Sequence, residues 1–175
     1  DKIVIYDNSD VVSSCRCWYN FIYFGHKPEL VQVLDGGLKK WKKENRITNN
    51  NLPIILKSNY KADEKKKLVK NKLDIDKNII LKEFTVIDAR SKERFEGNVA
   101  EPRKGLRSGS IKNSYCLPFT DLINEDGTFA DKDKILEKFK TTKNEFNNNL
   151  VFTCGSGVTA SVLALAYSLI DNKYM

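Results

Sequence analysis

Short apolar runs along the chain alternate with segments whose apolar residues recur at helical spacing. Residues 2–6 (KIVIY) form an apolar run that ends at Asp7, and residues 30–34 (LVQVL) form a second, closed by a turn at residues 35–37. Between them, residues 16–24 are rich in aromatics and long enough for a helix, with a glycine following as its C-terminal cap. Strand, helix and strand with short joints are typical of a parallel βαβ unit.

The same pattern begins again further along the chain. Residues 84–87 (FTVI) are predicted to form a strand, residues 133–146 a helix, and residues 150–153 (LVFT) a further strand. The last strand leads directly into a short glycine-rich loop, after which apolar residues from position 158 onward share one helical face. The sequence therefore predicts an α/β fold built from two units.

A polar stretch separates the two units. Seven lysines and two acidic residues lie between positions 57 and 72, and Tyr60 is the only aromatic residue among them. A nucleic-acid site would need this charge interleaved with aromatics or placed on a recognisable binding fold, so a solvated linker or insertion is the preferred interpretation. The predicted division is an N-terminal unit at residues 1–50, a linker at residues 51–78 and a C-terminal unit at residues 79–175.

Composition narrows the class of protein further. The 175 residues carry a net charge of +7 and are 41% hydrophobic, which excludes wholesale disorder. The longest apolar stretch, residues 158–170, is shorter than the roughly 20 residues that a membrane span needs, and no secretory signal is visible. The four cysteines show neither a zinc spacing nor a disulfide framework, so we expect reduced thiols in an intracellular compartment and no metal site.

Residues 153–160 (TCGSGVTA) carry the most informative chemistry. Cys154 stands at the end of a predicted buried strand, the edge at which ligands bind in open α/β sheets. Gly155 and Gly157 allow successive N–H groups to point inward, and the N-terminus of the following helix adds a fractional positive charge. Both effects favour the thiolate over the thiol, so Cys154 is predicted to be a nucleophile rather than a buried core cysteine.

Several other nucleophilic chemistries lack their partner residues. A papain-type protease needs a histidine, and the only one in the chain, His26, falls in the other unit. A phosphatase of the Cys-x5-Arg type needs an arginine where Ala160 stands, and Ser156 is not part of a G-x-S-x-G elbow. The loop therefore indicates a cysteine that is activated by its backbone surroundings.

The loop TCGSGVTA resembles the active-site loop of the rhodanese-fold sulfurtransferases, in the Cys-Gly-Ser-Gly-Val-Thr form of the mercaptopyruvate enzymes. Residues 86–119, from VIDARSKERFEG to SYCLPF, are similar to the approach to the catalytic domain in the same family. Residues 4–26 and 33–41 (VLDGGLKKW) resemble the second half of the non-catalytic repeat that precedes it. The resemblance implies an α/β rhodanese-like three-layer fold, a parallel sheet flanked by helices, in two tandem repeats. The first repeat is then incomplete, and the chain is expected to be truncated at both ends.

The resemblance implies an enzyme that moves sulfane sulfur. Cys154 would take sulfur from 3-mercaptopyruvate or thiosulfate as a persulfide and pass it to a thiol acceptor such as thioredoxin, or to cyanide, without a cofactor. The implied location is the cytoplasm or the mitochondrion, and neither a membrane nor a nucleic acid is an expected partner. Asp7 holds the corresponding position in the N-terminal unit, so catalysis is expected at Cys154 alone. The alternative is a catalytically silent binding or regulatory module.

The resemblance also assigns residues to the site. Arg94 and Arg103 fall where the family binds the anionic end of the donor, and a guanidinium can hold a carboxylate in bidentate fashion. Ser156 is implied in catalysis, through a proton relay. The other loop residues implied in substrate binding are Gly155, Gly157, Val158 and Thr159. Because the loop carries no charged side chain, the monoanionic keto acid is the expected donor rather than thiosulfate. Ser110 stands where the family has a histidine, so a contact made by that histidine is lost.

Overall fold

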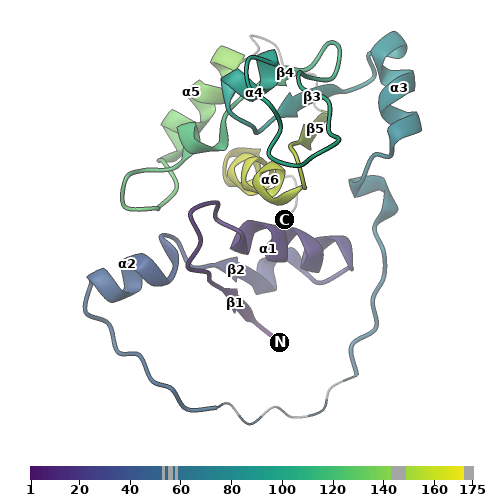
Figure 1. Ribbon diagram of the computed structural model, residues 1–175. Helices are drawn as coiled ribbons and strands as arrows, with labels where there is room; N and C mark the ends of the chain where they lie inside the picture. The colour runs from purple at the N-terminus through teal and green to yellow at the C-terminus, as the bar shows by residue number, and fades with distance from the viewer. Residues whose placement is uncertain (53, 55–56, 58, 143–148, 172–175) are drawn as a thin grey trace.

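The computed structural model describes residues 1–52, 54, 57, 59–142 and 149–171 (Figure 1). In the N-terminal unit two parallel strands pair in register, with Ile3 opposite Val31 and Ile5 opposite Val33. The unit consists of β1 (Ile3–Ile5), α1 (Ser14–Tyr23), the 3-10 helix η1 (Pro28–Leu30), β2 (Val31–Val33) and α2 (Gly37–Lys43). The βαβ unit predicted from the hydrophobic pattern is therefore confirmed.

The C-terminal unit contains a three-stranded parallel sheet in the order β4-β3-β5. Its central strand is buried along its whole length, which agrees with an uninterrupted apolar run in a parallel sheet. Helices α4 to α6 surround this sheet (Figure 1). The elements from the linker onward are η2 (Lys66–Leu68), α3 (Lys72–Leu81), β3 (Thr85–Asp88), α4 (Lys92–Glu96), β4 (Tyr115–Cys116), η3 (Phe119–Leu122), α5 (Lys132–Thr142), β5 (Leu150–Thr153) and α6 (Val158–Asp171).

The extents of two segments differ from the sequence prediction. The helix predicted over residues 133–146 is α5, which runs over Lys132–Thr142, and Phe146 lies outside the described residues. Helix α3 crosses the predicted boundary between residues 78 and 79, because Asn78 fastens this helix to the C-terminal unit. The buried Asn78 amide donates to the Phe84 carbonyl and accepts from the Phe84 N–H, both at 2.9 Å. The end of the predicted linker thus folds with the sheet that follows it.

Helix α6 packs against both units, as Figure 1 shows. One face joins the core of the C-terminal unit, where the rings of Phe139 and Tyr167 meet edge to face at 5.3 Å. On another face Ala164 lies in a second cluster with Trp18 and Ile22 of α1. An alanine at this position leaves room for the large indole ring, so the two helices bury apolar surface between them.

A polar contact joins the two units at a second place. The Asp35 carboxylate, after β2, accepts a hydrogen bond from the Phe129 N–H at 2.8 Å. Next to it, the Lys40 ammonium group forms an ion pair with Asp126 at 2.8 Å. The turns after β2 and after η3 are therefore held against each other, which fixes the orientation of the units more firmly than the helix contact alone.

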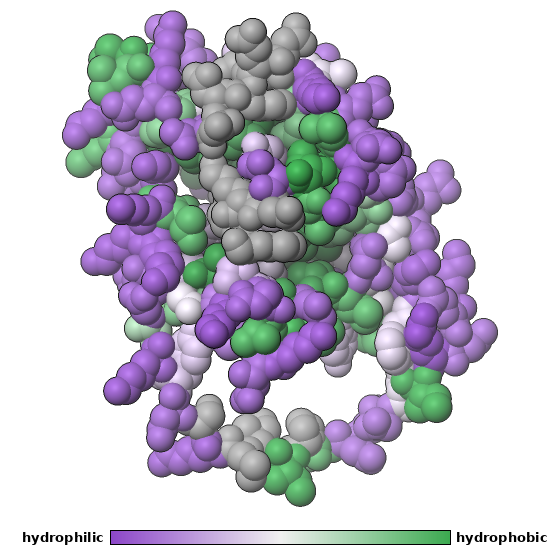
Figure 2. Space-filling view, turned by 180° about the vertical axis from the view of Figure 1, so that it is seen from behind, coloured by the Kyte–Doolittle hydropathy of each residue, from purple (hydrophilic) through white to green (hydrophobic). Residues whose placement is uncertain are grey.

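The chain between α2 and α3, which contains the lysine-rich stretch, is only partly free of the body. Its first part, with Ile47 and Leu52 each about nine-tenths exposed, runs apart from the rest of the chain in both views (Figures 1 and 2). Its second part lies along the end of α1, where the N–H groups of Asp63 and Lys65 donate to helix carbonyls at 3.0 and 2.7 Å. The Tyr19 hydroxyl donates to the Leu68 carbonyl at 2.5 Å. A solvated linker is thus an apt description of the first part, while the second part caps a helix.

The packing between α1 and α6 generates a stability prediction. Replacing Trp18, which is 4% exposed, with alanine should lower the free energy of unfolding by about 3–5 kcal/mol, because a large cavity opens between the helices. The matched control is Trp41→Ala on α2, a tryptophan that is only partly buried and should cost less than half as much. Chemical denaturation followed by far-ultraviolet circular dichroism measures both. Equal losses for the two variants would contradict the central role of this contact.

Candidate functional site

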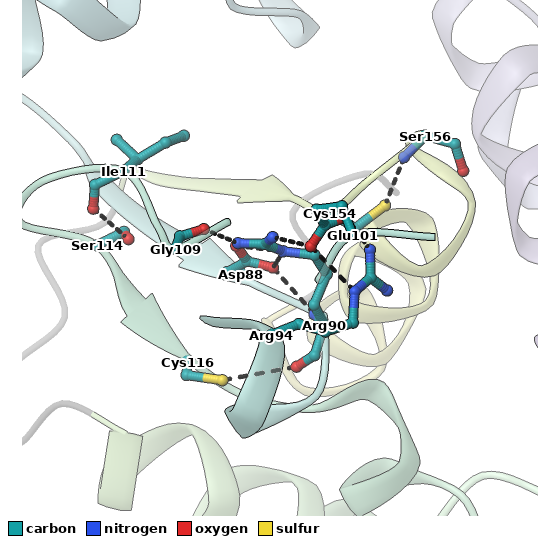
Figure 3. A network of polar contacts seen from close by, with 10 residues as sticks. All are labelled: Asp88, Arg90, Arg94, Glu101, Gly109, Ile111, Ser114, Cys116, Cys154 and Ser156. Atoms are coloured by element: carbon teal, nitrogen blue, oxygen red, sulfur yellow. Dashed lines mark hydrogen bonds and ion pairs between the residues drawn. The ribbon is translucent and has the colours of Figure 1, made fainter. Parts of the chain in front are cut away.

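Cys154 lies directly after β5, at the carboxyl end of the parallel sheet, and the chain then turns into α6. The turn depends on Gly157, whose φ of +82° lies in the left-handed region that favours glycine. In this conformation the N–H groups of Gly157 and Ser156 donate to the Cys154 sulfur at 3.0 and 3.4 Å (Figure 3). The glycine-rich loop therefore forms the N–H cradle that the sequence predicted around the thiol.

The electrostatics of the cradle favour the thiolate. Burial by itself raises the pKa of the Cys154 thiol, but hydrogen bonds from the Thr159 hydroxyl and from the Ser156, Ala160 and Gly157 backbone outweigh it. The net result is a pKa below the usual value for cysteine. The Thr159 hydroxyl is the largest of these stabilising contacts, and its donation to sulfur gives this residue a role in setting the charge of the nucleophile.

Two other cysteines have the opposite character. Burial, reinforced by the nearby Asp7 carboxylate, raises the pKa of Cys15 to about 12. Burial and the Asp88 carboxylate raise the pKa of Cys116 to about 11, and this thiol donates to the Arg90 carbonyl at 3.6 Å. At neutral pH both stay protonated and are poor nucleophiles, so the site chemistry is concentrated at Cys154.

Arg94, on α4, is held against the loop. A Cβ atom added at Gly155 would lie 3.1 Å from the Arg94 Nη2 atom, so the glycine leaves space for the guanidinium. Glu101 fixes this side chain through two contacts, with Nε at 3.1 Å and with Nη2 at 2.5 Å. Arg94 therefore presents a pre-oriented cation beside Cys154 (Figure 3), as expected for a residue that binds an anionic donor.

A buried charge network supports Arg94 from below. Asp88, at the end of β3, accepts from the Arg90 guanidinium at 2.7 to 3.0 Å. Arg90 also donates to Glu101 at 2.7 Å and to the Gly109 carbonyl at 2.8 Å. Hydrogen bonds from Arg94 and then Arg90 hold the pKa of Glu101 below its usual value. Two acids and two arginines are thus paired, which is the condition for burying charges beneath a site.

This network was not singled out in the sequence analysis. Its signals are present in retrospect: an aspartate and an arginine follow the buried strand directly, and Glu101 precedes the Pro-Arg pair that drew attention to Arg103. No local pattern indicates which of these side chains pair, because Glu101 and Arg90 are 11 positions apart and a stretch without regular structure lies between α4 and Glu101. Their pairing could only be found in the folded chain.

The structure brings most of the predicted site residues together. The loop residues Gly155, Ser156, Gly157, Val158 and Thr159 surround or follow Cys154, and Arg94 lies against them. Arg103 differs: it is exposed in the loop between α4 and β4, and its side chain has no hydrogen bond or ion pair within the described part of the chain. The role predicted for Arg103, binding of the donor, stays a prediction.

The N-terminal unit repeats the cradle with a different occupant. Asp7 follows β1, and its carboxylate accepts from the Ser14 N–H at 2.9 Å at the start of α1. The hydroxyl groups of Ser9 and Ser13 donate to the same carboxylate oxygen at 2.7 Å. Although burial opposes ionisation, these hydrogen bonds hold the pKa of Asp7 below its usual value. A permanent carboxylate fills the position that the thiol occupies in the C-terminal unit.

A second arginine reaches the loop from the N-terminal unit. Arg16 belongs to the first turn of α1, and its guanidinium lies directly against Gly157, where it would overlap any added Cβ atom. The sequence analysis did not select Arg16, because it is 141 positions away from Gly157 in a unit predicted to be non-catalytic. The residues around this arginine (SSCRCW) do not indicate that its side chain contacts a distant loop.

Two other features are absent from the described residues. No group of three or more His, Cys, Asp or Glu side chains there could hold a metal ion. No helix in that part of the chain has the length and apolar character to cross a membrane.

Comparison with known proteins adds the family. A model of the rhodanese-like domain matches residues 1–44. Human 3-mercaptopyruvate sulfurtransferase is 36% identical over 165 residues, which cover 93% of this chain and 55% of that protein. Bovine thiosulfate sulfurtransferase is 33% identical over 167 residues, covering 94% of this chain and 56% of that protein. The chain thus spans about half the length of the curated relatives it matches.

Solved structures agree with this assignment. The crystal structure of SseA from Escherichia coli, a 3-mercaptopyruvate sulfotransferase, superposes with a TM-score of 0.84 at 26% identity, covering 99% of this chain and 64% of that one. Tum1 from Saccharomyces cerevisiae, with a TM-score of 0.80 at 23% identity over 98% of this chain and 61% of that one, shares the fold. The parallel sheets flanked by helices are those of the rhodanese fold, as predicted, and the chain belongs to the rhodanese family.

Proposed function

We propose that the protein is a sulfurtransferase in which Cys154 carries sulfane sulfur as a persulfide from a small anionic donor to a thiol or to cyanide. The observation that carries this proposal is the thiol itself: it accepts two loop N–H hydrogen bonds, has a lowered pKa and lies beside a fixed arginine. The named relatives that act on 3-mercaptopyruvate and thiosulfate support it.

The transfer follows from this geometry. The Cys154 thiolate attacks the sulfur of 3-mercaptopyruvate, a sulfur–sulfur bond forms and the carbon–sulfur bond breaks. The released electron pair stays on carbon, which takes up the proton of the donor thiol to give pyruvate. The negative charge now lies on the outer persulfide sulfur, within reach of the loop N–H groups. A thiolate or cyanide then attacks that outer sulfur and returns Cys154 as the thiolate.

Donor choice follows from the charges around the thiol. The loop from Cys154 to Thr159 contributes no charged side chain, and Arg94 shares its charge with Glu101. One carboxylate is therefore better matched than the two charges of thiosulfate, and 3-mercaptopyruvate is the preferred donor in this proposal. Ser156, in the predicted relay, would supply or receive a proton during carbon–sulfur cleavage.

The first test concerns the sulfur carrier. After treatment with 3-mercaptopyruvate, the intact mass should rise by one sulfur atom, and this gain should vanish in Cys154→Ser because no thiolate remains in the cradle. The matched control is Cys116→Ser, which removes a thiol with a raised pKa and should keep the added sulfur. Sulfur retained by Cys154→Ser would contradict the proposal, and no added sulfur in the unmodified protein would favour a silent binding module.

The second test is a pH profile. Because the Thr159 hydroxyl stabilises the Cys154 thiolate, Thr159→Val should raise the thiol pKa by about one unit. The acid limb of kcat/KM, which follows the thiolate fraction in the free enzyme, should then move to higher pH by the same amount. The control is Thr141→Val on α5, where the hydroxyl donates to the Lys138 carbonyl. An unchanged acid limb in Thr159→Val would show that another group sets it.

The third test asks whether Arg103 binds the donor or is a surface arginine without a role in binding. If Arg103 binds the carboxylate of the donor, Arg103→Ala removes a charge-assisted pair worth roughly 1.5–3 kcal/mol, so kcat/KM for 3-mercaptopyruvate should fall about 10- to 150-fold. The fall for thiosulfate should be smaller. Arg107→Ala in the same exposed loop is the control and should change neither value. Equal losses for both donors in Arg103→Ala would assign this arginine a structural role instead.

A further inference from the structure

Arg16 is an exposed cation without a charged partner in the described residues. It makes no ion pair or hydrogen bond there, although acidic side chains are common over the whole chain. Its guanidinium lies against Gly157, which belongs to the other unit. The side chain therefore crosses from the N-terminal unit to the loop that follows Cys154.

The position of Arg16 does not favour its own helix. It lies in the first turn of α1, a helix with no acidic residue in that turn. A positive charge at a helix N-terminus opposes the helix dipole and lowers helix stability. The charge of Arg16 therefore does not stabilise α1, and any favourable effect of it must come from outside this helix.

Arg16 reaches the loop from a cavity that Cys154 does not line. It lines a cavity of about 470 Å³, together with Tyr19, Phe152 and Ala164, on which Gly157 borders but Cys154 does not. Arg94 contacts the loop at Gly155, from the α4 side. The two arginines thus contact different glycines of the same loop, Arg94 from the C-terminal unit and Arg16 from the N-terminal unit.

The contact is close enough to affect the sulfur. Gly157 donates its N–H to the Cys154 sulfur at 3.0 Å, and the Arg16 guanidinium touches the same residue. Bond lengths along this path place the guanidinium within about 8 Å of the sulfur. At this range a unit charge still contributes to the potential at a partly buried atom.

The other charges near Cys154 cancel one another. Arg94, from α4, is paired with Glu101, and Arg90 is paired with Asp88 at the end of β3. Arg90 also pairs with Glu101, so these two arginines and two acids balance one another. Arg16 from α1 makes no such pair within the described residues. The other charged residues that line its cavity are Lys67, Lys70 and Glu83.

We propose that Arg16 is a positioning residue for the Cys154 loop, which holds Gly157 from the N-terminal unit and supplies positive potential to the sulfur. The inference rests on the proposed function, in that a charged sulfur is the reactive species. It gives the N-terminal unit, whose own cradle is filled by Asp7, a direct part in the chemistry of the C-terminal unit.

The test measures the Cys154 thiol without requiring turnover. The intact protein is alkylated with iodoacetamide over a range of pH, and the modified Cys154 peptide is quantified by mass spectrometry, which separates it from the other three cysteines. Arg16→Met should raise the Cys154 pKa by about half a unit to one unit, and slow alkylation at pH 7 by about three- to tenfold. Arg16→Lys should keep the pKa within about 0.3 units, because the charge is retained.

Controls separate this role from packing and from the proposed function. Lys43→Met removes one exposed charge from α2 and should leave the Cys154 pKa unchanged. Arg16→Gln gives the same neutralisation if the Met variant does not fold, as judged by circular dichroism. A folded neutral variant with an unchanged pKa, or a Lys variant shifted as far as the Met variant, would overturn the inference. Failure of persulfide formation would instead refute the proposed function, and it is scored separately by intact mass.

Discussion

Helix α6 has to satisfy two hydrophobic cores at once, and this constraint determines the geometry of the site. Leu163 and Tyr167 pack into the C-terminal unit, while Ala164 faces Trp18 of the N-terminal unit. A helix buried on several sides cannot rotate or slide without opening a cavity. Its first turn, which carries Thr159 and follows the Cys154 loop, is therefore held in place by packing that lies more than a turn away.

Paired charges provide the second source of rigidity. Around Glu101, hydrogen bonds lead from Asp88 through Arg90 to Arg94, and every buried side-chain nitrogen and oxygen in the described residues has a partner. Breaking one ion pair would leave a charge without a partner in the protein interior, where the dielectric constant is low. Because this is strongly destabilising, the network resists rearrangement as a whole. Arg94 is thereby held in one orientation, which would reduce the entropy lost if it binds an anionic donor as proposed.

The sequence predicted those features that depend on neighbouring residues. Loop 154–157 was identified because two glycines, a thiol and a helix start act within a few positions of one another, and their hydrogen bonds are local. The docking of residues 63–68 on α1, the pairing of Glu101 with two arginines and the reach of Arg16 to Gly157 were missed. Each of these contacts joins residues that are far apart in the sequence or are separated by irregular structure. Composition does not help either, because a lysine-rich stretch has the same composition whether or not it packs against a helix.

The carboxylate of Asp7 has a consequence for how the protein withstands oxidants. A thiolate that is easily formed is also easily oxidised, so Cys154 is open to conversion to sulfenic or sulfinic acid, which would end the proposed sulfur transfer. Asp7 cannot follow that course, and its hydrogen bonds to Ser14 and Ser13 keep the start of α1 capped whatever the redox state of the cell. Because α1 in turn supports α6 through Trp18, we expect the protein to stay folded when Cys154 is oxidised. A reductant could then regenerate the thiol, provided that oxidation has stopped at the sulfenic acid.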